Sequence, residues 1–362
     1  MQSESTHTDT SDRGFDLGRV PARLVAGDRL SEQESQAVFE ALLGGGLDEA
    51  QIGAIIALIQ SRGVTVDELV GAARAMREHV TPVPYTPKPG EVVIDTCGTG
   101  GAAKTFNVST AAAIVAASAT PESGSGIERV VVAKHGNRSR TGRGSAEVLA
   151  GLGVNIEASP EAQARCLKEV GVCFSFAMRH HPAMRHAAGP RRSLGFPTIF
   201  NLLGPLTNPA GAKHQLLGVY GARFVGLIAE ALARLGSERA VVVHGAGGLD
   251  EVSTLGPSDA AWVADGGVTT QPIDPAGLVP IGSIEALQAR DLADGVRILT
   301  DVLDGASGPP RDIVVLNAAV ALRVAGASAD LGAGVAAAAD AIDSGRASNT
   351  LQGLARLSGG TV

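Results

Sequence analysis

The sequence predicts an α/β protein, with a small all-helical N-terminal domain followed by a larger α/β domain that has a mostly parallel central sheet. Two observations carry this prediction. Residues 20–80 show apolar positions at helical spacing together with helix-capping signals. After a proline-rich stretch, short valine-rich runs alternate with helix-length segments, which is typical of parallel strands covered by helices on both faces.

Three helices account for most of the predicted helical domain, residues 17–89. Ser31 with Glu34, and Thr65 with Glu68, have the spacing of capping boxes at helix starts. Four prolines between residues 82 and 89 then form a stiff linker to the next domain. The helix between the two capping boxes has apolar residues at a period of about 3.6 residues. They are Ile52, Ile55, Ile56 and Ile59.

The predicted α/β domain, residues 90–362, contains six short apolar runs that fit strands. Residues 180–200, rich in His, Arg and Pro, fit neither a strand nor a simple helix. We expect this segment to cross back and complete the helical domain. The predicted strands are residues 92–95, 130–134, 172–177, 215–220, 240–245 and 313–317.

Composition narrows the class of protein. The 362 residues carry a formal net charge of -7, which disfavours a general nucleic-acid binder. Cys97, Cys166 and Cys173 have no metal-site spacing and form no even disulfide set, so we expect a reduced, cytoplasmic setting. Residues 1–16 are polar and lack the apolar core of a signal peptide, so a disordered tail is expected. No apolar run is long enough for a membrane helix.

A glycine-rich segment, residues 98–107 (the first loop), follows a predicted strand and precedes a helix start. Its backbone N–H groups and the helix dipole are expected to bind an anion such as phosphate. Two known motifs nearly match. A nucleoside-triphosphate loop needs glycine where Ala103 precedes Lys104 and Thr105. A dinucleotide loop needs an acidic residue about 20 positions further on, which is missing.

A second polar segment, residues 134–145 (the second loop), also follows a predicted strand. It begins with Lys134 and includes Asn137 and Arg138. Side chains at the carboxyl end of a parallel strand lie where open α/β sheets bind ligands. Two such loops on neighbouring strands are therefore expected to hold two phosphate groups.

Six motifs follow one another along the chain. They are GTGG with TFNVST, KHGNRS, GSAEVLAGLGV, HPAM, RRSLG with TIFNLLGPLTNP, and GLDEVS. In this order they resemble the motifs of the anthranilate phosphoribosyltransferases, and the resemblance covers residues 20–357. It implies transfer of the phosphoribosyl group from phosphoribosyl pyrophosphate (PRPP) to the amine of anthranilate, with release of pyrophosphate, in tryptophan biosynthesis. It also implies a cytoplasmic homodimer paired through the helical domains, with two Mg²⁺ ions per active site.

The resemblance implies three sets of site residues and no strong general base. Ser109, Asp250 and Glu251 match metal ligands, which suits the preference of Mg²⁺ for oxygen donors. Arg191 matches the arginine that meets the anthranilate carboxylate. The other matches to anthranilate contacts are Gly98, His135, Asn137 and Met184. The matches to PRPP contacts are Gly98, Gly100, Gly101, Thr105, Asn107, Val108, Ser109, Thr110, Lys134, His135, Gly136, Asn137, Arg138, Ser139 and Ser145.

The loops depart from the family pattern. Gly101 is followed by Ala102 and Ala103, so an acidic residue that is usual in the first loop is absent. The second loop carries Arg140 and Arg143 where serines are more usual. We hypothesise that the lost carboxylate and the gained guanidinium groups both favour a polyanionic substrate.

Two alternative functions are considered. A pyrimidine nucleoside phosphorylase shares the fold but would need a basic phosphate site in place of Asp250 and Glu251. A non-catalytic relative that binds nucleic acid would show a basic surface and salt-dependent binding. The acidic pair disfavours the first alternative, and the negative net charge disfavours the second.

Overall fold

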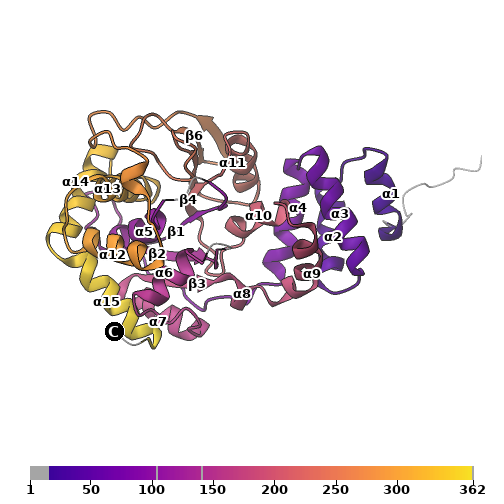
Figure 1. The fold of residues 1–362 in the computed structure, drawn as a ribbon, viewed down its shortest axis with the longest axis horizontal. Coiled ribbons are helices and arrows are strands. Elements are labelled where there is room, and N and C mark those ends of the chain that lie inside the picture. Colours follow the sequence, from indigo (N-terminus) through magenta and orange to yellow (C-terminus); the bar gives the residue numbers. More distant parts are fainter. Residues whose placement is uncertain (1–15, 103–104, 140–141, 361–362) are drawn as a thin grey trace, which may run out of the picture.

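The computed structural model describes residues 16–102, 105–139 and 142–360. A helical bundle forms one end of the molecule and an α/β domain forms the other (Figure 1). The expected tail at 1–16 lies outside the described residues except for Asp16, as do Ala103, Lys104 and Arg140. Within the described ranges, no helix has both the length and the apolar character needed to cross a membrane.

The bundle confirms the predicted helices. Its main elements are α1 (Val20–Val25), α2 (Glu32–Leu43), α3 (Glu49–Arg62) and α4 (Val66–Glu78). The hydroxyls of Ser31 and Thr65 accept bonds from the N–H groups of Glu34 and Glu68, which closes both predicted capping boxes. The exact division of the chain at residue 89 stays a prediction.

The segment at 180–200 packs on the bundle and is more helical than predicted. It begins at the end of α8 (Ala177–His180), contains α9 (Arg185–Leu194) and ends within α10 (Ile199–Leu203). Helix α9 packs on α2 and α3, and α10 packs on α3 and α4. Pro190 lies inside α9. A proline in a helix interior weakens the sequence signal for a helix because it removes one backbone donor.

The central sheet has seven strands in the order β3-β2-β1-β4-β5-β6-β7. Strands β1 to β5 pair in parallel, and β6 and β7 are antiparallel. The sheet is therefore mostly parallel, as predicted. The strands are β1 (Glu91–Gly98), β2 (Arg129–Gly136), β3 (Val172–Phe176), β4 (His214–Gly218), β5 (Arg239–His244), β6 (Asp259–Ala264) and β7 (Gly267–Thr270).

The predicted strand at 313–317 is wrong, because these residues lie in helix α13 (Pro309–Val324). Two prolines after Gly308 start this helix, since proline is well suited to the first helical turn. The helix is buried between α5 and α14. A helix buried on all sides shows no amphipathic stripe, so its valine-rich run looks like a strand.

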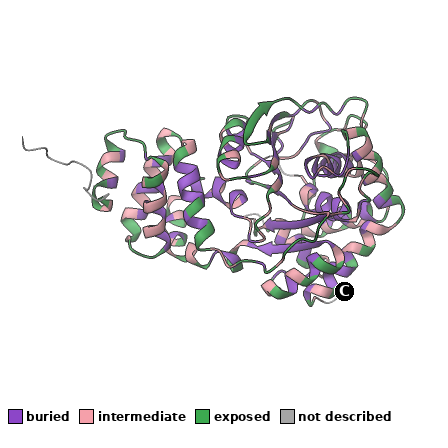
Figure 2. Cartoon of the chain, turned by 180° about the vertical axis from the view of Figure 1, so that it is seen from behind, coloured by how far each residue is buried: buried purple, intermediate pink, exposed green. Residues whose placement is uncertain are grey.

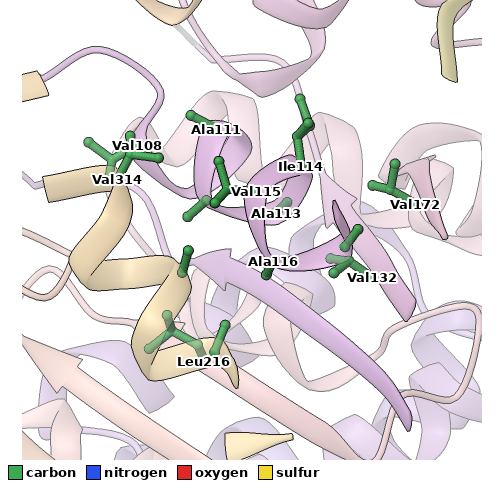
Figure 3. Packing of buried hydrophobic residues seen from close by; sticks show 14 of the residues in the cluster. Val108, Ala111, Ala113, Ile114, Val115, Ala116, Val132, Val172, Leu216 and Val314 are labelled. Atoms are coloured by element: carbon green, nitrogen blue, oxygen red, sulfur yellow. The ribbon is translucent and has the colours of Figure 1, made fainter. Parts of the chain in front are cut away.

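Two apolar cores cover the two faces of the sheet. One contains α5 (Val108–Ser118), whose residues pack against Val132, Leu216 and Val314 (Figure 3). The other joins the opposite face to the helical bundle. Figure 2 shows the central strands largely buried. The remaining helices are α6 (Ser145–Gly151), α7 (Pro160–Val170), α11 (Phe224–Arg234), α12 (Leu292–Leu303), α14 (Leu331–Asp343) and α15 (Arg346–Ser358).

Candidate active site

The two loops begin at the same edge of the sheet. The first follows β1 and the second follows β2, and these strands are parallel neighbours. Strands β4 and β5 pair on the other side of β1 and end at the same edge. The first loop then leads into α5, whose buried residues fix the helix start in place. This edge is where open parallel sheets bind ligands.

Lys134 links the second loop to β1 and α5, the two elements that flank the first loop. Its ammonium group donates to the carbonyl of Thr96 at 2.5 Å and to the hydroxyl of Ser109 at 3.2 Å. Burial lowers the pKa of Lys134, although the carboxyl group of Asp95 and the acidic pair oppose this effect. The second loop thus places a buried amine beside the start of α5.

The acidic pair, Asp250 and Glu251, reaches the same place from the segment after β5. The carboxylate of Glu251 accepts a bond from the backbone N–H of Ser109 at 3.1 Å. Burial, and next the charge of Asp250, raise the pKa of Glu251 to about 8. Ser109 therefore contacts both Lys134 and Glu251, so three predicted site residues from distant parts of the chain meet at one point.

Glycines at two strand ends make room for Asp250. A Cβ at Gly218 would lie 1.6 Å from the backbone oxygen of Asp250. A Cβ at Gly98 would lie 2.9 Å from a carboxylate oxygen of the same residue. The clash at Gly218 would be with backbone, so the end of β4 needs glycine for Asp250 to occupy its position. A side chain at Gly98 would instead require the Asp250 carboxylate to turn away.

The acidic pair and the Ser109 hydroxyl fit a hard divalent cation. The chain offers two carboxylates and one hydroxyl, and the described residues contain no group of three acidic, His or Cys side chains with metal-site geometry. Mg²⁺ suits such a sparse set because it usually keeps waters and binds substrate phosphates in addition to one or two carboxylates. The raised pKa of Glu251 indicates electrostatic strain that a cation would relieve.

The second loop is closed by its own contacts. The Glu147 carboxylate accepts from the N–H of Gly144 at 2.9 Å and from that of Ser139 at 3.4 Å. The hydroxyl of Ser145 donates to the Asn137 carbonyl at 3.4 Å. Glu147 is absent from the predicted set. Its carboxylate makes only half of a capping box at the start of α6, because Gly144 has no side chain to return the bond.

His135 is buried and neutral. Its backbone N–H donates to the carboxylate of Asp95 at 3.0 Å, and its ring Nδ1 lies 3.1 Å from the Gly204 carbonyl. Burial lowers the pKa of His135 well below 6.5. Its ring lies 5.1 Å from that of His181. Asp95, a second residue missed by the sequence prediction, thus holds the start of the second loop.

Arg191 lies on α9, at the boundary with the helical bundle. Its guanidinium stacks over Phe200 at 5.0 Å from the ring centroid. Burial lowers the pKa of Arg191. No described residue forms an ion pair with it. Met184 packs at the edge of the core shared with the bundle. Among the described contacts, nothing brings Arg191 or Met184 into direct contact with Ser109.

The remaining predicted residues fall into three groups. Gly100 and Gly101 have positive φ angles of 64° and 95°, which favour glycine. Val108 and Thr110 are buried, and the backbone N–H of Val108 already donates to the Phe106 carbonyl at 2.8 Å. The others with described contacts are Thr105, which donates to the Phe106 carbonyl, Asn107, which donates to the Arg143 carbonyl, Gly136, which lies close to Ser145, and Arg138, which stacks on Phe176.

Both domains match known protein families. Residues 20–80 match the helical bundle domain of a glycosyl transferase family, and residues 90–348 match the α/β domain of a glycosyl transferase family. The anthranilate phosphoribosyltransferase of Anaeromyxobacter sp. (strain K) is 49% identical over 336 residues, covering 92% of this chain and 96% of that protein. The chain belongs to the anthranilate phosphoribosyltransferase family.

Two solved structures of anthranilate phosphoribosyltransferases share the fold. The enzyme from Thermus thermophilus gives a TM-score of 0.85 at 37% identity, covering 94% of this chain and 99% of that chain. The enzyme from Saccharomyces cerevisiae, in complex with PRPP and Mg, gives a TM-score of 0.84 at 25% identity, covering 95% and 98%. The chain is therefore a pentosyltransferase of tryptophan biosynthesis, and neither alternative function is retained.

Proposed function

We propose that the two loops and the acidic pair form the site where this anthranilate phosphoribosyltransferase joins its substrates. The phosphoribosyl group of PRPP passes to the amine of anthranilate, giving N-(5-phosphoribosyl)anthranilate and pyrophosphate. The observation that carries this proposal is the meeting of Ser109, Lys134 and Glu251 at the edge of the sheet. These residues come from three separate motifs, and a chance phosphate loop would not require their contact.

The loops bind PRPP in this proposal. The first loop and the start of α5 lie beside the pyrophosphate, where the partial positive charge of the helix end favours an anion. The proposed PRPP contacts are those that the family motifs predict: Gly98, Gly100, Gly101, Thr105, Asn107, Val108, Ser109, Thr110, Lys134, His135, Gly136, Asn137, Arg138, Ser139 and Ser145. Ser109, Asp250 and Glu251 hold Mg²⁺, at two ions per site. The yeast relative solved with PRPP and Mg supports the metal.

The site lowers the barrier of the reaction by stabilising the negative charge that develops on the leaving pyrophosphate. The bond between the ribose carbon and the pyrophosphate oxygen breaks while the amine nitrogen bonds to that carbon. Negative charge grows on pyrophosphate, and N–H donors with Lys134 stabilise it. Bound Mg²⁺ would neutralise part of the same charge. The amine of anthranilate is an aryl amine and is neutral near pH 7, so the site needs to position it for attack rather than deprotonate it beforehand. Once the nitrogen is bonded to the ribose carbon it loses one proton, which the released pyrophosphate accepts.

Arg191 binds the anthranilate carboxylate in this proposal, and Gly98, His135, Asn137 and Met184 line the place of the ring. The planar guanidinium suits a carboxylate because it can donate two parallel bonds. The lack of an acidic partner for Arg191 among the described side chains supports this role, as does its rigid stacking on Phe200.

Substitution of Arg191 by Ala should raise the KM for anthranilate about 10–100-fold, the usual worth of a charged hydrogen bond. The KM for PRPP should stay within about twofold, because a different part of the site binds PRPP. Steady-state kinetics with each substrate varied in turn measures both values. Arg192→Ala is the matched control, since Arg192 is the adjacent, exposed arginine. Equal effects of the two variants would contradict the assignment.

The reaction itself is tested by mixing protein, anthranilate, PRPP and Mg²⁺ and following the loss of anthranilate fluorescence. Fluorescence should fall only when all components are present, and a chelator should stop the reaction. Absence of turnover with folded protein would contradict the proposed reaction.

We also propose that the enzyme is a cytoplasmic homodimer paired through its helical domains. The proposed bounds are about residues 17–89 for the helical domain and 90–362 for the α/β domain. Light scattering checks the oligomeric state.

A further inference from the structure

One backbone segment, residues 284–291 (the bracing segment), contacts both loops. The N–H of Phe106, in the first loop, donates to the carbonyl of Leu287 at 2.8 Å. The guanidinium of Arg143, in the second loop, donates from a single nitrogen to the carbonyls of Ala289 at 2.7 Å and Arg290 at 2.9 Å. The two loops therefore share one support.

Arg143 is also bonded within the loops. The side-chain amide of Asn107 donates to the Arg143 carbonyl at 3.4 Å. The N–H of Arg143 donates to the hydroxyl of Ser139 at 3.4 Å. Asn107 and Ser139 are both in the proposed set of PRPP contacts. Arg143 thus lies where the first loop, the second loop and the bracing segment meet.

The bracing segment is itself held firmly. Leu287 is fully buried in the core. The N–H and the guanidinium of Arg290 both donate to the carboxylate of Asp294 at 3.0 Å, which anchors the segment to the first turn of α12. Helix α12 packs on α6, which follows the second loop directly. A bond to this segment therefore fixes a loop relative to the core.

These contacts differ from the role expected for Arg143 from the sequence. In its described side-chain hydrogen bonds, the guanidinium donates to two neutral backbone carbonyl groups. The side chain is therefore bonded to the protein rather than to an anion. Such bonds from a charged donor are strong and directional. Arg140, the other half of that hypothesis, lies outside the described residues.

We propose that Arg143 is a positioning residue for PRPP binding, because it ties the second loop to the segment that holds the first loop. It sets the spacing of the two loops without touching the substrate. This inference rests on the proposed assignment of both loops to PRPP. It predicts that loss of the side chain weakens PRPP binding at every ionic strength, since no direct charge attraction is lost.

The test compares Arg143→Gln, Arg143→Lys and Arg356→Gln with the wild-type enzyme. Arg143→Gln should raise the KM for PRPP about tenfold with kcat within about twofold, which indicates lost binding rather than lost chemistry. Arg143→Lys should recover part of this loss, because one ammonium can donate to both carbonyls. Arg356→Gln removes the same charge from an exposed position on α15 and should leave the KM unchanged. Thermal melting checks that every variant is folded.

Ionic strength separates positioning from direct attraction. The ratio of the KM values of Arg143→Gln and wild type should be the same at about 0.05 M and about 0.5 M salt, where exposed charges are screened very differently. A ratio that falls toward one at high salt, or an unchanged KM, overturns the positioning role. Calorimetric titration with PRPP gives the same comparison without turnover. Wild-type protein that binds PRPP but does not turn over contradicts only the proposed reaction, and protein that does neither contradicts both.

Discussion

Replacing Asp250 by Asn together with Glu251 by Gln should lower kcat by about 100-fold or more while the protein stays folded. Metal stabilisation of developing charge is worth several kcal/mol, and each factor of ten costs about 1.4 kcal/mol. Added Mg²⁺ should no longer raise the melting temperature of the variant. Fluorescence kinetics and thermal melting with and without Mg²⁺ measure both effects.

The same variant tests the electrostatics of the acidic pair without metal. Glu251 has a pKa of about 8 when folded against an ordinary value of 4.5. The folded protein therefore keeps a proton that the unfolded chain loses, so the free energy of unfolding should fall as pH rises from 4.5 to about 8. The variant should show a smaller fall.

A charge-matched control removes two carboxylates elsewhere. Glu157 and Glu169 are both exposed, and Glu157→Gln with Glu169→Gln makes the same change in net charge. This control should keep both turnover and the pH profile of the wild type. Turnover of the Asp250 and Glu251 variant within about tenfold of the wild type would rule out the acidic pair as the main metal ligands.

Gly218→Ala should displace the acidic pair or the end of β4 on which it packs. The added Cβ would lie 1.6 Å from the backbone oxygen of Asp250, so either the end of β4 or the acidic pair must move. Overpacking of this kind costs about 1–3 kcal/mol. We expect kcat/KM to fall about 100-fold or more, because small displacements of positioning groups are costly. The melting temperature should fall, and the Mg²⁺ concentration for half-maximal activity should rise.

A second glycine provides the control. Gly226 lies in helix α11, is exposed, and has open space around the position of a Cβ. Gly226→Ala should leave activity unchanged and stabilise the protein by up to about 1 kcal/mol, through helix propensity. If Gly218→Ala kept the kinetics of the Gly226→Ala variant, the close packing of β4 on Asp250 would be unimportant for function.

The strands and the two loops could be predicted because their signals are local. A valine-rich run that ends in glycine and polar residues marks the carboxyl end of a parallel strand, whatever the rest of the chain does. Residues 313–317 carry a valine-rich run as well, although no glycine follows it, and burial between α5 and α14 made them apolar in a helix. The hairpin of β6 and β7 was missed because β7 is short and exposed.

The site was predictable as a set of residues but not as a set of contacts. Family motifs identified Ser109, Lys134 and Glu251, whereas their meeting depends on how distant strands align. Asp95 and Arg143 show the limit most clearly. Asp95 bonds to a residue 40 positions away, and Arg143 bonds to residues 146 and 147 positions away. Neither separation leaves a pattern in the sequence.

The return of the chain to the helical bundle has a consequence for synthesis on the ribosome. Helices α1 to α4 are made first, but α9 and α10, which pack on them, follow only after β1, β2 and β3. Phe39 in α2 meets its aromatic partner Phe200 at 5.6 Å, and Phe200 is made much later. Domains usually fold as units during synthesis. Here the first domain to emerge is completed only after much of the second has followed it.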